Sequence, residues 1–231
     1  MVKNRIAIIL ARGGSKRLPR KNIIDFGGRP LLAWSVVAAL ESNKFDKVLV
    51  STDDEEIAQV GVKYGAEVPF LRLEANDDIS PSSEATCAAL LQAEEYWTTK
   101  FDVVAQLMAN CPLRTAQDVH NSILAFDNNT APSQISCFRF GWMNPWWAVG
   151  LQHDGKPQRL FPEVQNTRSQ DLPDLYCPTG ALWIAKRDAL IGSRNFYMEG
   201  HRFEPMHWLS AVDIDDEDDL LMAKMSLGLR K

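Results

Sequence analysis

Five cationic side chains stand close together in segment 11–22, ARGGSKRLPRKN, directly after the apolar run IAIIL. Clustered lysines and arginines repel one another, so their concentration favours a ligand that brings negative charge. Two adjacent glycines, Gly13 and Gly14, let backbone N–H groups approach such a ligand, and Pro19 stiffens the return of the loop. The segment therefore predicts a polyphosphate site. The five cations are Arg12, Lys16, Arg17, Arg20 and Lys21.

Two common phosphate-binding patterns do not occur in the sequence. The chain contains neither GxxxxGK[ST] nor GxGxxG. A Walker A loop and a dinucleotide-binding fingerprint are therefore excluded, because each needs its glycines at those spacings.

A pair of carboxylates near the end of the chain predicts a metal site. In VDIDDEDD, Asp213 and Asp215 are two residues apart in an apparently extended segment, which directs both side chains to one side. Mg²⁺ prefers one or two carboxylates together with phosphate oxygens, so we expect this pair to bind Mg²⁺ or Mn²⁺ beside a triphosphate. The acids at 216–219 have another explanation, because acids are favoured in the first turn of a helix.

Alternating strand and helix patterns predict the elements that position these residues. An open, mostly parallel sheet with helices on both faces, a three-layer α/β/α Rossmann-like fold, follows from this alternation. Ligands of such sheets bind beyond the carboxyl ends of the strands, which is where the basic loop begins. The expected strands are 5–11, 46–52, 67–71, 102–108, 133–140, 207–214 and the start of 179–191, and the main expected helices are 27–42, 53–66, 84–97, 115–127 and 215–229.

The alternation is interrupted between residues 140 and 178. This stretch contains three tryptophans, Trp142, Trp146 and Trp147, and five prolines, with little helical periodicity. We therefore expect a nucleotide-binding α/β domain made of 1–139 and 179–231, with 140–178 as an insertion of hairpins or loops. Its aromatic residues favour either a small core of its own or contact with a second subunit.

The overall composition limits the classes of partner. The chain has 231 residues, of which 45% are hydrophobic, and a formal net charge of −5. Such an acidic molecule is not expected to bind nucleic acid or an anionic membrane, so the basic loop predicts a small local ligand. No apolar run approaches the roughly 18 residues of a membrane span, and we expect a cytoplasmic protein.

The motifs together resemble a known family. ARGGSKRLPRKN, VSTDDEEIA, YGAEVPFLR, NCPLRT and DIDDEDDL, in this order, are similar to motifs of the acylneuraminate cytidylyltransferases, a family that includes enzymes for legionaminic and pseudaminic acids. The resemblance extends over nearly the whole chain. The related sugar-1-phosphate nucleotidylyltransferases usually begin with GxGTRxxPxTxxxPK, which this sequence lacks.

The resemblance implies roles for individual residues. It implies that the first loop binds the phosphates of CTP through Arg12, Ser15, Lys16, Lys21 and Asn22, with Gly13 and Gly14. It implies a cytidine pocket at Arg72, Ser82 and Ser83, an acceptor-sugar site at Gln106, and a grip on the sugar carboxylate by Arg168 and Gln170. It implies metal binding by Asp213 and Asp215. Of these residues, we expect Arg12, Lys21 and Asp215 to act in the reaction itself.

The sequence departs from the family pattern beside the expected sugar. The family often has LQPTSPLR where this chain has LMANCPLR, so Ala109, Asn110 and Cys111 differ from the usual residues. Thr179 also stands where an asparagine commonly precedes Gly-Ala. These differences concern the identity of the sugar more than the reaction.

The expected reaction is attack by the anomeric hydroxyl of a nine-carbon 2-keto acid sugar on the α-phosphorus of CTP, which releases pyrophosphate. Legionaminic or pseudaminic acid is an alternative acceptor, and 3-deoxy-manno-octulosonate is a more distant one. A non-catalytic nucleotide-binding protein is a further alternative, although it would be expected to lack Lys21 or the pair Asp213 and Asp215. The resemblance also implies a homodimer in which segment 140–178 lies near the partner's active site.

Overall fold

A six-stranded sheet forms the centre of the molecule. The computed structural model describes residues 3–74, 80–141 and 143–230. The strand order is β10-β6-β9-β5-β1-β4. β1 pairs in parallel with β4 and β5, and β10 with β6, whereas β9 is antiparallel to both neighbours. The expectation of an open, mostly parallel sheet is confirmed. The strands are β1 (Arg5–Leu10), β4 (Lys47–Ser51), β5 (Val103–Met108), β6 (Ser133–Arg139), β9 (Tyr176–Lys186) and β10 (Arg202–Pro205).

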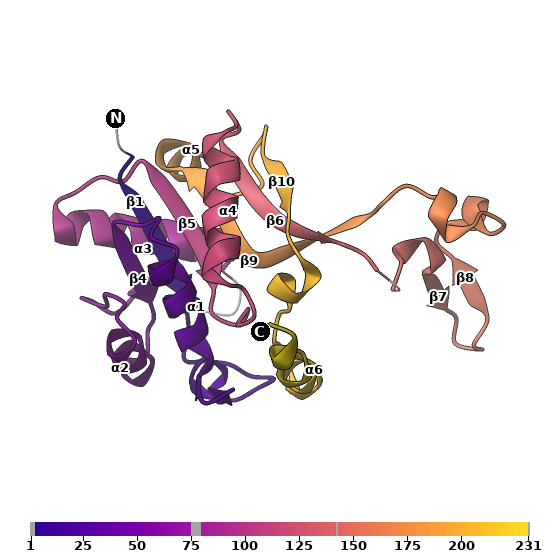
Figure 1. Cartoon of the computed structure of the whole chain (residues 1–231), viewed down its shortest axis with the longest axis horizontal. Coiled ribbons are helices and arrows are strands. Elements are labelled where there is room, and N and C mark those ends of the chain that lie inside the picture. The colour runs from indigo at the N-terminus through magenta and orange to yellow at the C-terminus, as the bar shows by residue number, and fades with distance from the viewer. Residues whose placement is uncertain (1–2, 75–79, 142, 231) are drawn as a thin grey trace.

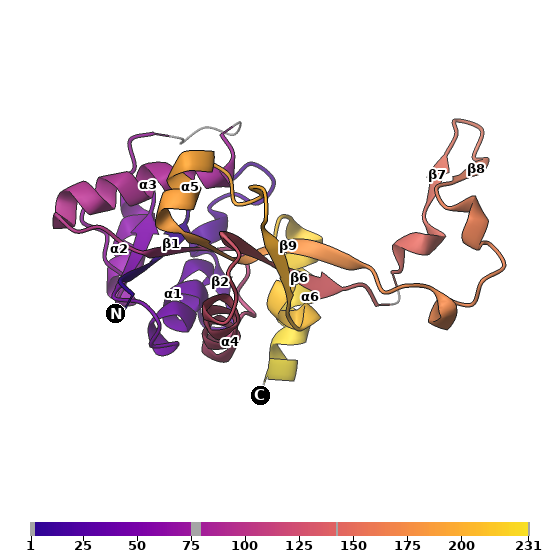
Figure 2. The same ribbon diagram turned by 90° about the horizontal axis from the view of Figure 1, so that it is seen from above.

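Helices cover both faces of this sheet. Figure 2 shows α3 and α5 on one face, and α1 and α4 on the other. The three layers thus agree with the expected α/β/α arrangement. The α-helices are α1 (Leu31–Glu41), α2 (Glu55–Lys63), α3 (Ser82–Trp97), α4 (Ala116–Asp127), α5 (Arg187–Ser193) and α6 (Glu217–Leu227).

Strand β1 shows why the core has two halves. Residues Ile6 to Ile9 of this strand are fully buried, and their side chains alternate between the faces of the sheet. Ala7 and Ile9 pack in the cluster that contains the buried residues of α1 and α4. Ile6 and Ile8 pack in the cluster on the α3 side. Burial on both faces accounts for the continuous apolar run in this strand.

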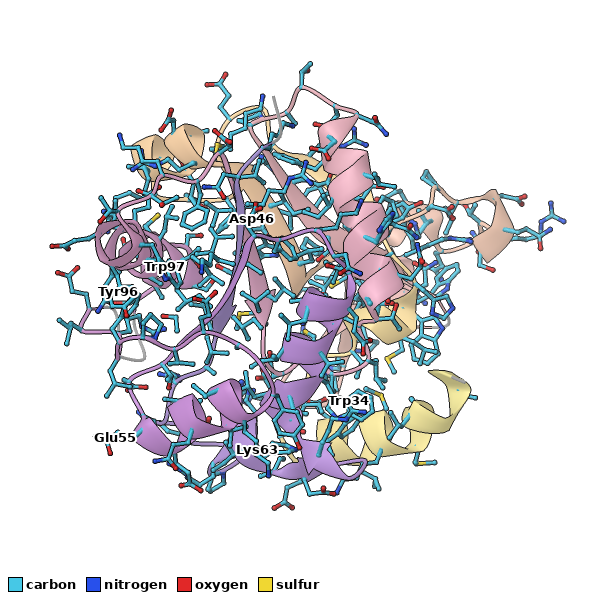
Figure 3. All side chains as sticks on the ribbon, turned by 60° about the vertical axis from the view of Figure 1, so that its left-hand side comes forward. Trp34, Asp46, Glu55, Lys63, Tyr96 and Trp97 are labelled. Carbon is cyan, nitrogen blue, oxygen red and sulfur yellow. The ribbon has the colours of Figure 1, made fainter. Side chains whose placement is uncertain are left out.

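A third apolar cluster lies beside the end of the sheet and joins the basic loop to the C-terminal region. It contains Leu18 of the loop, Phe26 of β2 (Asp25–Phe26), Ile214 of the segment before α6, and Ala223 of α6 itself. The short strand β2 pairs with β3 (Arg29–Pro30). Trp34 packs against the same cluster, and Figure 3 shows it between α1 and α6. This packing brings two segments about 200 residues apart to the same edge of the sheet.

Two of the expected strands are wrong. Segment 67–71 forms only a single bridge, between Glu67 and Leu49, because Pro69 has no N–H group with which to extend a ladder. Segment 207–214 contains the 3₁₀ helix η5 (Trp208–Ala211) instead of a strand. The side chain of His207 accepts a hydrogen bond from the Leu209 N–H group and so caps this helix.

Residues 140–141 and 143–175 form an extension, called the arm below, that projects from the body beyond the end of β6 and the start of β9 at Tyr176 (Figure 1). It contains the β7–β8 hairpin and three 3₁₀ helices. Val164 is the only buried residue in the described part of the arm, so the arm has no substantial core of its own. Trp142 lies outside the described residues. The elements of the arm are β7 (Val149–Leu151), β8 (Pro157–Arg159), η2 (Pro145–Trp147), η3 (Pro162–Val164) and η4 (Ser169–Asp171).

The described helices include none that is both long enough and apolar enough to cross a bilayer.

Candidate active site

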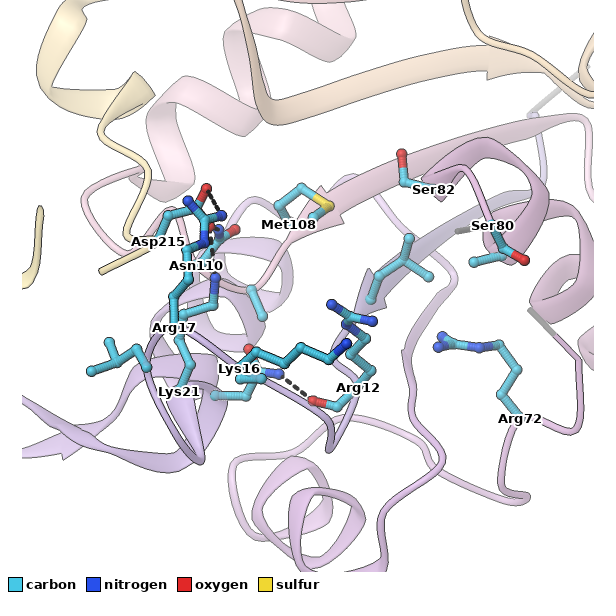
Figure 4. A pocket seen from close by; sticks show the side chains of 16 residues that line it. Arg12, Lys16, Arg17, Lys21, Arg72, Ser80, Ser82, Met108, Asn110 and Asp215 are labelled. Atoms are coloured by element: carbon cyan, nitrogen blue, oxygen red, sulfur yellow. Dashed lines mark hydrogen bonds and ion pairs between the residues drawn. The ribbon is translucent and has the colours of Figure 1, made fainter. Parts of the chain in front are cut away.

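A cavity of about 570 Å³ opens where β1 and β5 end. Leu10 and Met108, the last residues of these strands, both line it. Figure 4 shows side chains from the basic loop, from the segment before α3 and from the C-terminal region around the same space. The expected position at the carboxyl edge of the sheet thus has a matching cavity.

The basic loop forms one wall of this cavity. Its polar lining side chains are Arg12, Ser15, Lys16, Arg17, Lys21 and Asn22, and Leu18 also lines the cavity. Asn22 lies at the start of the short helix η1 (Lys21–Ile23), where its Nδ2 atom donates a hydrogen bond of 2.8 Å to the carbonyl oxygen of Arg12. This bond crosses the loop, as the dashed line in Figure 4 shows, and fixes its two ends relative to each other.

Arg20 is turned away from the cavity. Its guanidinium group donates a 2.6 Å hydrogen bond to Asp54 and also contacts Glu56. The Arg20 backbone has a left-handed conformation, with φ of 57°. The hydrogen bond from Arg20, more than any other contact, lowers the pKa of Asp54. Arg20 therefore serves the shape of the loop, and it adds no charge to the cavity wall.

The two glycines of the loop also differ from the expectation. The Gly13 N–H group donates to Asp53 Oδ1 at 2.9 Å, so it is already engaged within the protein. A Cβ atom at position 13 would lie 2.9 Å from Asp54 Oδ2, which explains why glycine is required there. Gly14 is exposed and is not among the lining residues. The lack of a side chain at Gly13 therefore allows the loop backbone to lie close to the Asp54 side chain.

Asp215 contacts the basic loop at one end of the cavity. Lys21 Nζ donates to Asp215 Oδ1 at 2.8 Å, and Arg17 donates to Asp215 Oδ2 at 2.6 Å. Burial alone would raise the pKa of Asp215, but hydrogen bonds and charges from Lys21 and Arg17 lower it overall. Lys21 is the more enclosed partner, with 15% of its side chain exposed against 65% for Arg17.

Asn110 fastens the acidic segment to the end of β5. Its carbonyl oxygen accepts a 3.0 Å hydrogen bond from the Ile214 N–H group. Its Nδ2 atom donates to the Ile214 carbonyl at 3.2 Å and to Asp215 Oδ1 at 3.4 Å. Asn110 is buried, and its Oδ1 atom has no hydrogen-bond partner among the described residues. A buried acceptor without a partner is costly unless a ligand satisfies it.

Asp213 lies on the other side of Ile214, which is fully buried. Although Asp213 as a residue is exposed, the dense packing around its carboxyl group raises the pKa to about 6, and the charge of Asp215 contributes to this increase. The negative charge of Asp215 thus opposes ionisation of the Asp213 carboxyl group.

The other end of the cavity is lined by Arg72, Ser80 and Ser82. Arg72 is buried. Its Nη1 atom donates hydrogen bonds to the carbonyl oxygen of Ser51 at 3.1 Å and to the Ser51 Oγ atom at 3.0 Å. Burial lowers the pKa of Arg72. Ser83 points into the core instead, where its Oγ atom accepts a hydrogen bond from the Phe196 N–H group.

Gln106 lies behind the cavity wall. It is fully buried, its Oε1 atom accepts a 2.6 Å hydrogen bond from Thr86, and it is not a lining residue. Met108, two residues later on the same side of β5, lines the cavity in its place. Met108 and Ser80 were not expected at the site, although Met108 is part of the unusual LMANCPLR segment and Ser80 begins SPSSEAT.

Arg168 and Gln170 are in the arm and are not among the residues that line the cavity. The Arg168 guanidinium group donates to Asp171 at 2.7 Å and is largely exposed. Within one chain, the structure therefore does not bring these two residues to the site.

An α/β fold with a cationic loop beside Asp215 at the carboxyl edge of its sheet is typical of nucleotide-using transferases. Residues 6–187 match the family model described as cytidylyltransferase, and the chain belongs to this family.

Two bacterial relatives align over nearly the whole chain. The pseudaminic acid cytidylyltransferase of Campylobacter jejuni (strain 81-176) is 34% identical over 222 residues, which cover 95% of this chain and 94% of that one. The CMP-N,N'-diacetyllegionaminic acid synthase of Legionella pneumophila is 31% identical and covers 98% of this chain and 97% of its own.

A solved structure described as CMP:2-keto-3-deoxy-manno-octonic acid synthetase complexed with CTP has a TM-score of 0.71. It is 17% identical and the comparison covers 99% of this chain and 100% of that one. At this level of identity, the likeness establishes a shared fold.

Proposed function

We propose that this protein transfers CMP from CTP to the anomeric hydroxyl group of a nonulosonic acid and releases pyrophosphate. The observation that carries the proposal is a single cavity with phosphate-binding cations at one wall, Asp215 facing them and a polar pocket around Arg72 at the other end. The names of the relatives, which include pseudaminic and legionaminic acid enzymes, support an acceptor of this class.

The residues of the basic loop would act by neutralising and orienting the triphosphate. The oxygen of the acceptor forms a bond to the α-phosphorus while the bond between the α-phosphorus and the bridging oxygen of pyrophosphate breaks. Arg12, Lys16 and Lys21 would stabilise the negative charge that develops on the leaving group. Arg72, Ser80 and Ser82 would orient the nucleoside.

Asp215 is the candidate acceptor for the proton of the attacking hydroxyl group. Lys21 and Arg17 lower its pKa and so make it a weak base in the form described here. Arrival of a triphosphate would give both cations new partners and release the Asp215 carboxylate. In this proposal, exchange of partners by Lys21 couples nucleotide binding to the freeing of Asp215.

The donor atoms beside Asp215 fit a divalent cation. Asp213, Asp215 and the Oδ1 atom of Asn110 offer three oxygens, which suits Mg²⁺ or Mn²⁺ better than softer metals. Within the described residues, no cluster of three or more His, Cys, Asp or Glu residues suited to a metal occurs, so phosphate oxygens of CTP would complete the site. The cation would supply further neutralisation of the triphosphate charge.

We also propose a homodimer formed through the arm. Large apolar side chains on the arm are exposed and have no core of their own to pack in. Such residues are enriched in the centres of subunit interfaces. The most exposed of them are Met143, Trp147, Val149, Leu151 and Leu160.

A pyrophosphate-release assay tests the proposed reaction. The purified protein would be incubated with CTP, Mg²⁺ and, separately, sialic, legionaminic, pseudaminic and octulosonic acids. We expect turnover with at least one nonulosonic acid and little with octulosonic acid. Absence of pyrophosphate with every acceptor would refute the proposal and favour a non-catalytic nucleotide-binding role. Replacement of CTP by ATP, GTP or UTP provides the control for nucleotide specificity.

A further inference from the structure

We propose that Met108 selects the acceptor, favouring a deoxy, acylamino nonulosonic acid that presents a methyl or methylene group over one that presents a hydroxyl group. This inference rests on the proposed function and names the substrate class of the same cavity. It is carried by the position of Met108, by the contacts behind it and by the direction from which an acceptor must approach.

Met108 lies at the middle of the cavity. Figure 4 shows its side chain between Asp215 and Asn110 at one end and Ser82 at the other, with Lys16 on the opposite side. In a bound nucleotide, the α-phosphate lies between the base and the two outer phosphates. A side chain at the middle of the cavity is therefore close to the place where the new bond forms.

The direction of attack assigns Met108 to the acceptor. The attacking and leaving oxygens lie roughly in line with the phosphorus in this type of transfer. Lys16 and Lys21 belong to the wall that would bind the leaving pyrophosphate, so the acceptor must arrive from the opposite wall. That wall contains Met108 at the end of β5, and Gly180 of β9 lies directly behind it.

Contacts behind Met108 fix its side chain. A Cβ atom at Gly180 would lie 2.8 Å from Met108 Cγ, so Met108 occupies space that any larger residue at 180 would fill. The Nε2 atom of buried Gln106 also lies 3.9 Å from Met108 Sδ, within the distance for a hydrogen bond to sulfur. The thioether is thus held against β9 and presents an apolar surface to the cavity.

The apolar character of the surface around Met108 determines which acceptor sugar binds against it. Leu10, Ala85 and Ala109 also line the cavity, and they add apolar surface to that of Met108. A thioether sulfur is only a weak acceptor and cannot donate a hydrogen bond. A hydroxyl group brought against Met108 would lose hydrogen bonds to water, whereas a methyl group would gain by leaving water.

The sequence supports the same conclusion. When LMANCPLR is aligned without gaps with the family pattern LQPTSPLR, Met108, and not Gln106 as expected above, stands opposite the glutamine of that pattern. Glutamine and methionine are similar in length, but the glutamine amide both donates and accepts hydrogen bonds. The exchange replaces a group able to bind hydroxyls by one that is not.

The test compares two acceptors with the same ring stereochemistry. N,N'-Diacetyllegionaminic acid carries an acetamido group and a methyl group where N-acetylneuraminic acid carries hydroxyl groups. We expect wild-type kcat/KM to be about tenfold or more higher for N,N'-diacetyllegionaminic acid than for N-acetylneuraminic acid. In Met108→Gln, we expect this preference to fall about tenfold or more, with KM for CTP unchanged.

Two further variants separate selection from a general structural role. Met108→Leu keeps an apolar side chain and should retain the preference for the deoxy acid, even if its turnover is lower. Gly180→Ala should displace Met108 and raise KM for the acceptor without changing KM for CTP.

A wild-type preference for N-acetylneuraminic acid would overturn the inference, as would an unchanged preference in Met108→Gln. Both results are compatible with the proposed transferase reaction. Loss of turnover with every acceptor in the wild-type protein would instead refute the proposed function itself.

Discussion

Lys21 and Arg17 contact the same carboxylate from different environments. Both pair with Asp215, but Lys21 has 15% of its side chain exposed and Arg17 has 65%. Because solvent screens an exposed charge more strongly, Lys21 is the cation whose charge acts with more effect on a bound phosphate. The two residues therefore form a matched pair for a test of the basic loop.

We expect Lys21→Ala to lower kcat about 100-fold or more, because removal of one group that stabilises transition-state charge commonly has an effect of this size. The affinity for CTP should fall much less, since the other cations of the loop remain. Stopped-flow or steady-state kinetics would give kcat, and calorimetric titration would give the dissociation constant of CTP.

Arg17→Ala is the control for this prediction, and it should lower kcat by less than Lys21→Ala does. Equal losses in the two variants would mean that total charge matters and that the enclosed position of Lys21 does not.

At the scale of elements, Asp54 connects the basic loop to α2. Its Oδ1 atom accepts a 3.0 Å hydrogen bond from the Ile57 N–H group and so caps the helix, while Oδ2 accepts from Arg20 at 2.6 Å. The Asp53 side chain next to it binds the Gly13 N–H group. The start of α2 therefore determines the path of a loop that precedes it by about 35 residues.

We expect Asp54→Ala to lower the free energy of unfolding by about 1–2 kcal/mol through loss of the helix cap. It should also raise KM for CTP, because Arg20 loses the partner that holds the loop. Urea denaturation and steady-state kinetics measure the two effects. Glu56→Ala removes the exposed second partner of Arg20 and keeps the cap, so it should change stability little. A variant at 54 that loses stability but keeps the wild-type KM would show that the loop does not depend on this contact.

The sequence predicted those features of the fold that depend on local patterns. β1 was recognisable because a strand buried on both faces is continuously apolar, and the position of the basic loop follows from the end of that strand. The reversed direction of β9 was not recognisable, because a strand's own residues do not encode which way its neighbours run. Arg20 was expected among the phosphate-binding cations. It pairs with Asp54 and Glu56 instead, and the sequence of the loop does not show these partners because they come from another element.

Gln106 and Met108 show a similar limit within the site. Both lie on the same side of β5, and the pattern of the strand alone does not say where the core ends and the cavity begins. Thr86 of α3 covers Gln106, whereas Met108 lines the cavity. Asp213 and Asp215 flank buried Ile214 in a segment that is not a strand, and a metal ion shared by the two carboxylates stays a prediction.

At the scale of the whole molecule, the arm separates residues that the family resemblance assigns to one site. Arg168 and Gln170 are on the arm, and the cavity is in the body from which the arm projects (Figure 1). Exposed apolar residues on the arm favour contact with a second copy. If two chains associate through their arms, Arg168 of each chain can complete the cavity of the other.

This arrangement predicts complementation between two inactive variants. The Lys21→Ala variant lacks Lys21 in the cavity of the body but keeps Arg168 on its arm. The Arg168→Ala variant keeps Lys21 but lacks Arg168. In a heterodimer of the two, isolated with a different affinity tag on each chain, one site carries both defects and the other carries neither. We therefore expect about half of the wild-type activity per dimer, while each variant alone stays nearly inactive. Light scattering should give a mass near twice 26.0 kDa for the wild-type protein. If Arg168 served the cavity of its own chain, both sites of the heterodimer would be defective and no activity would return.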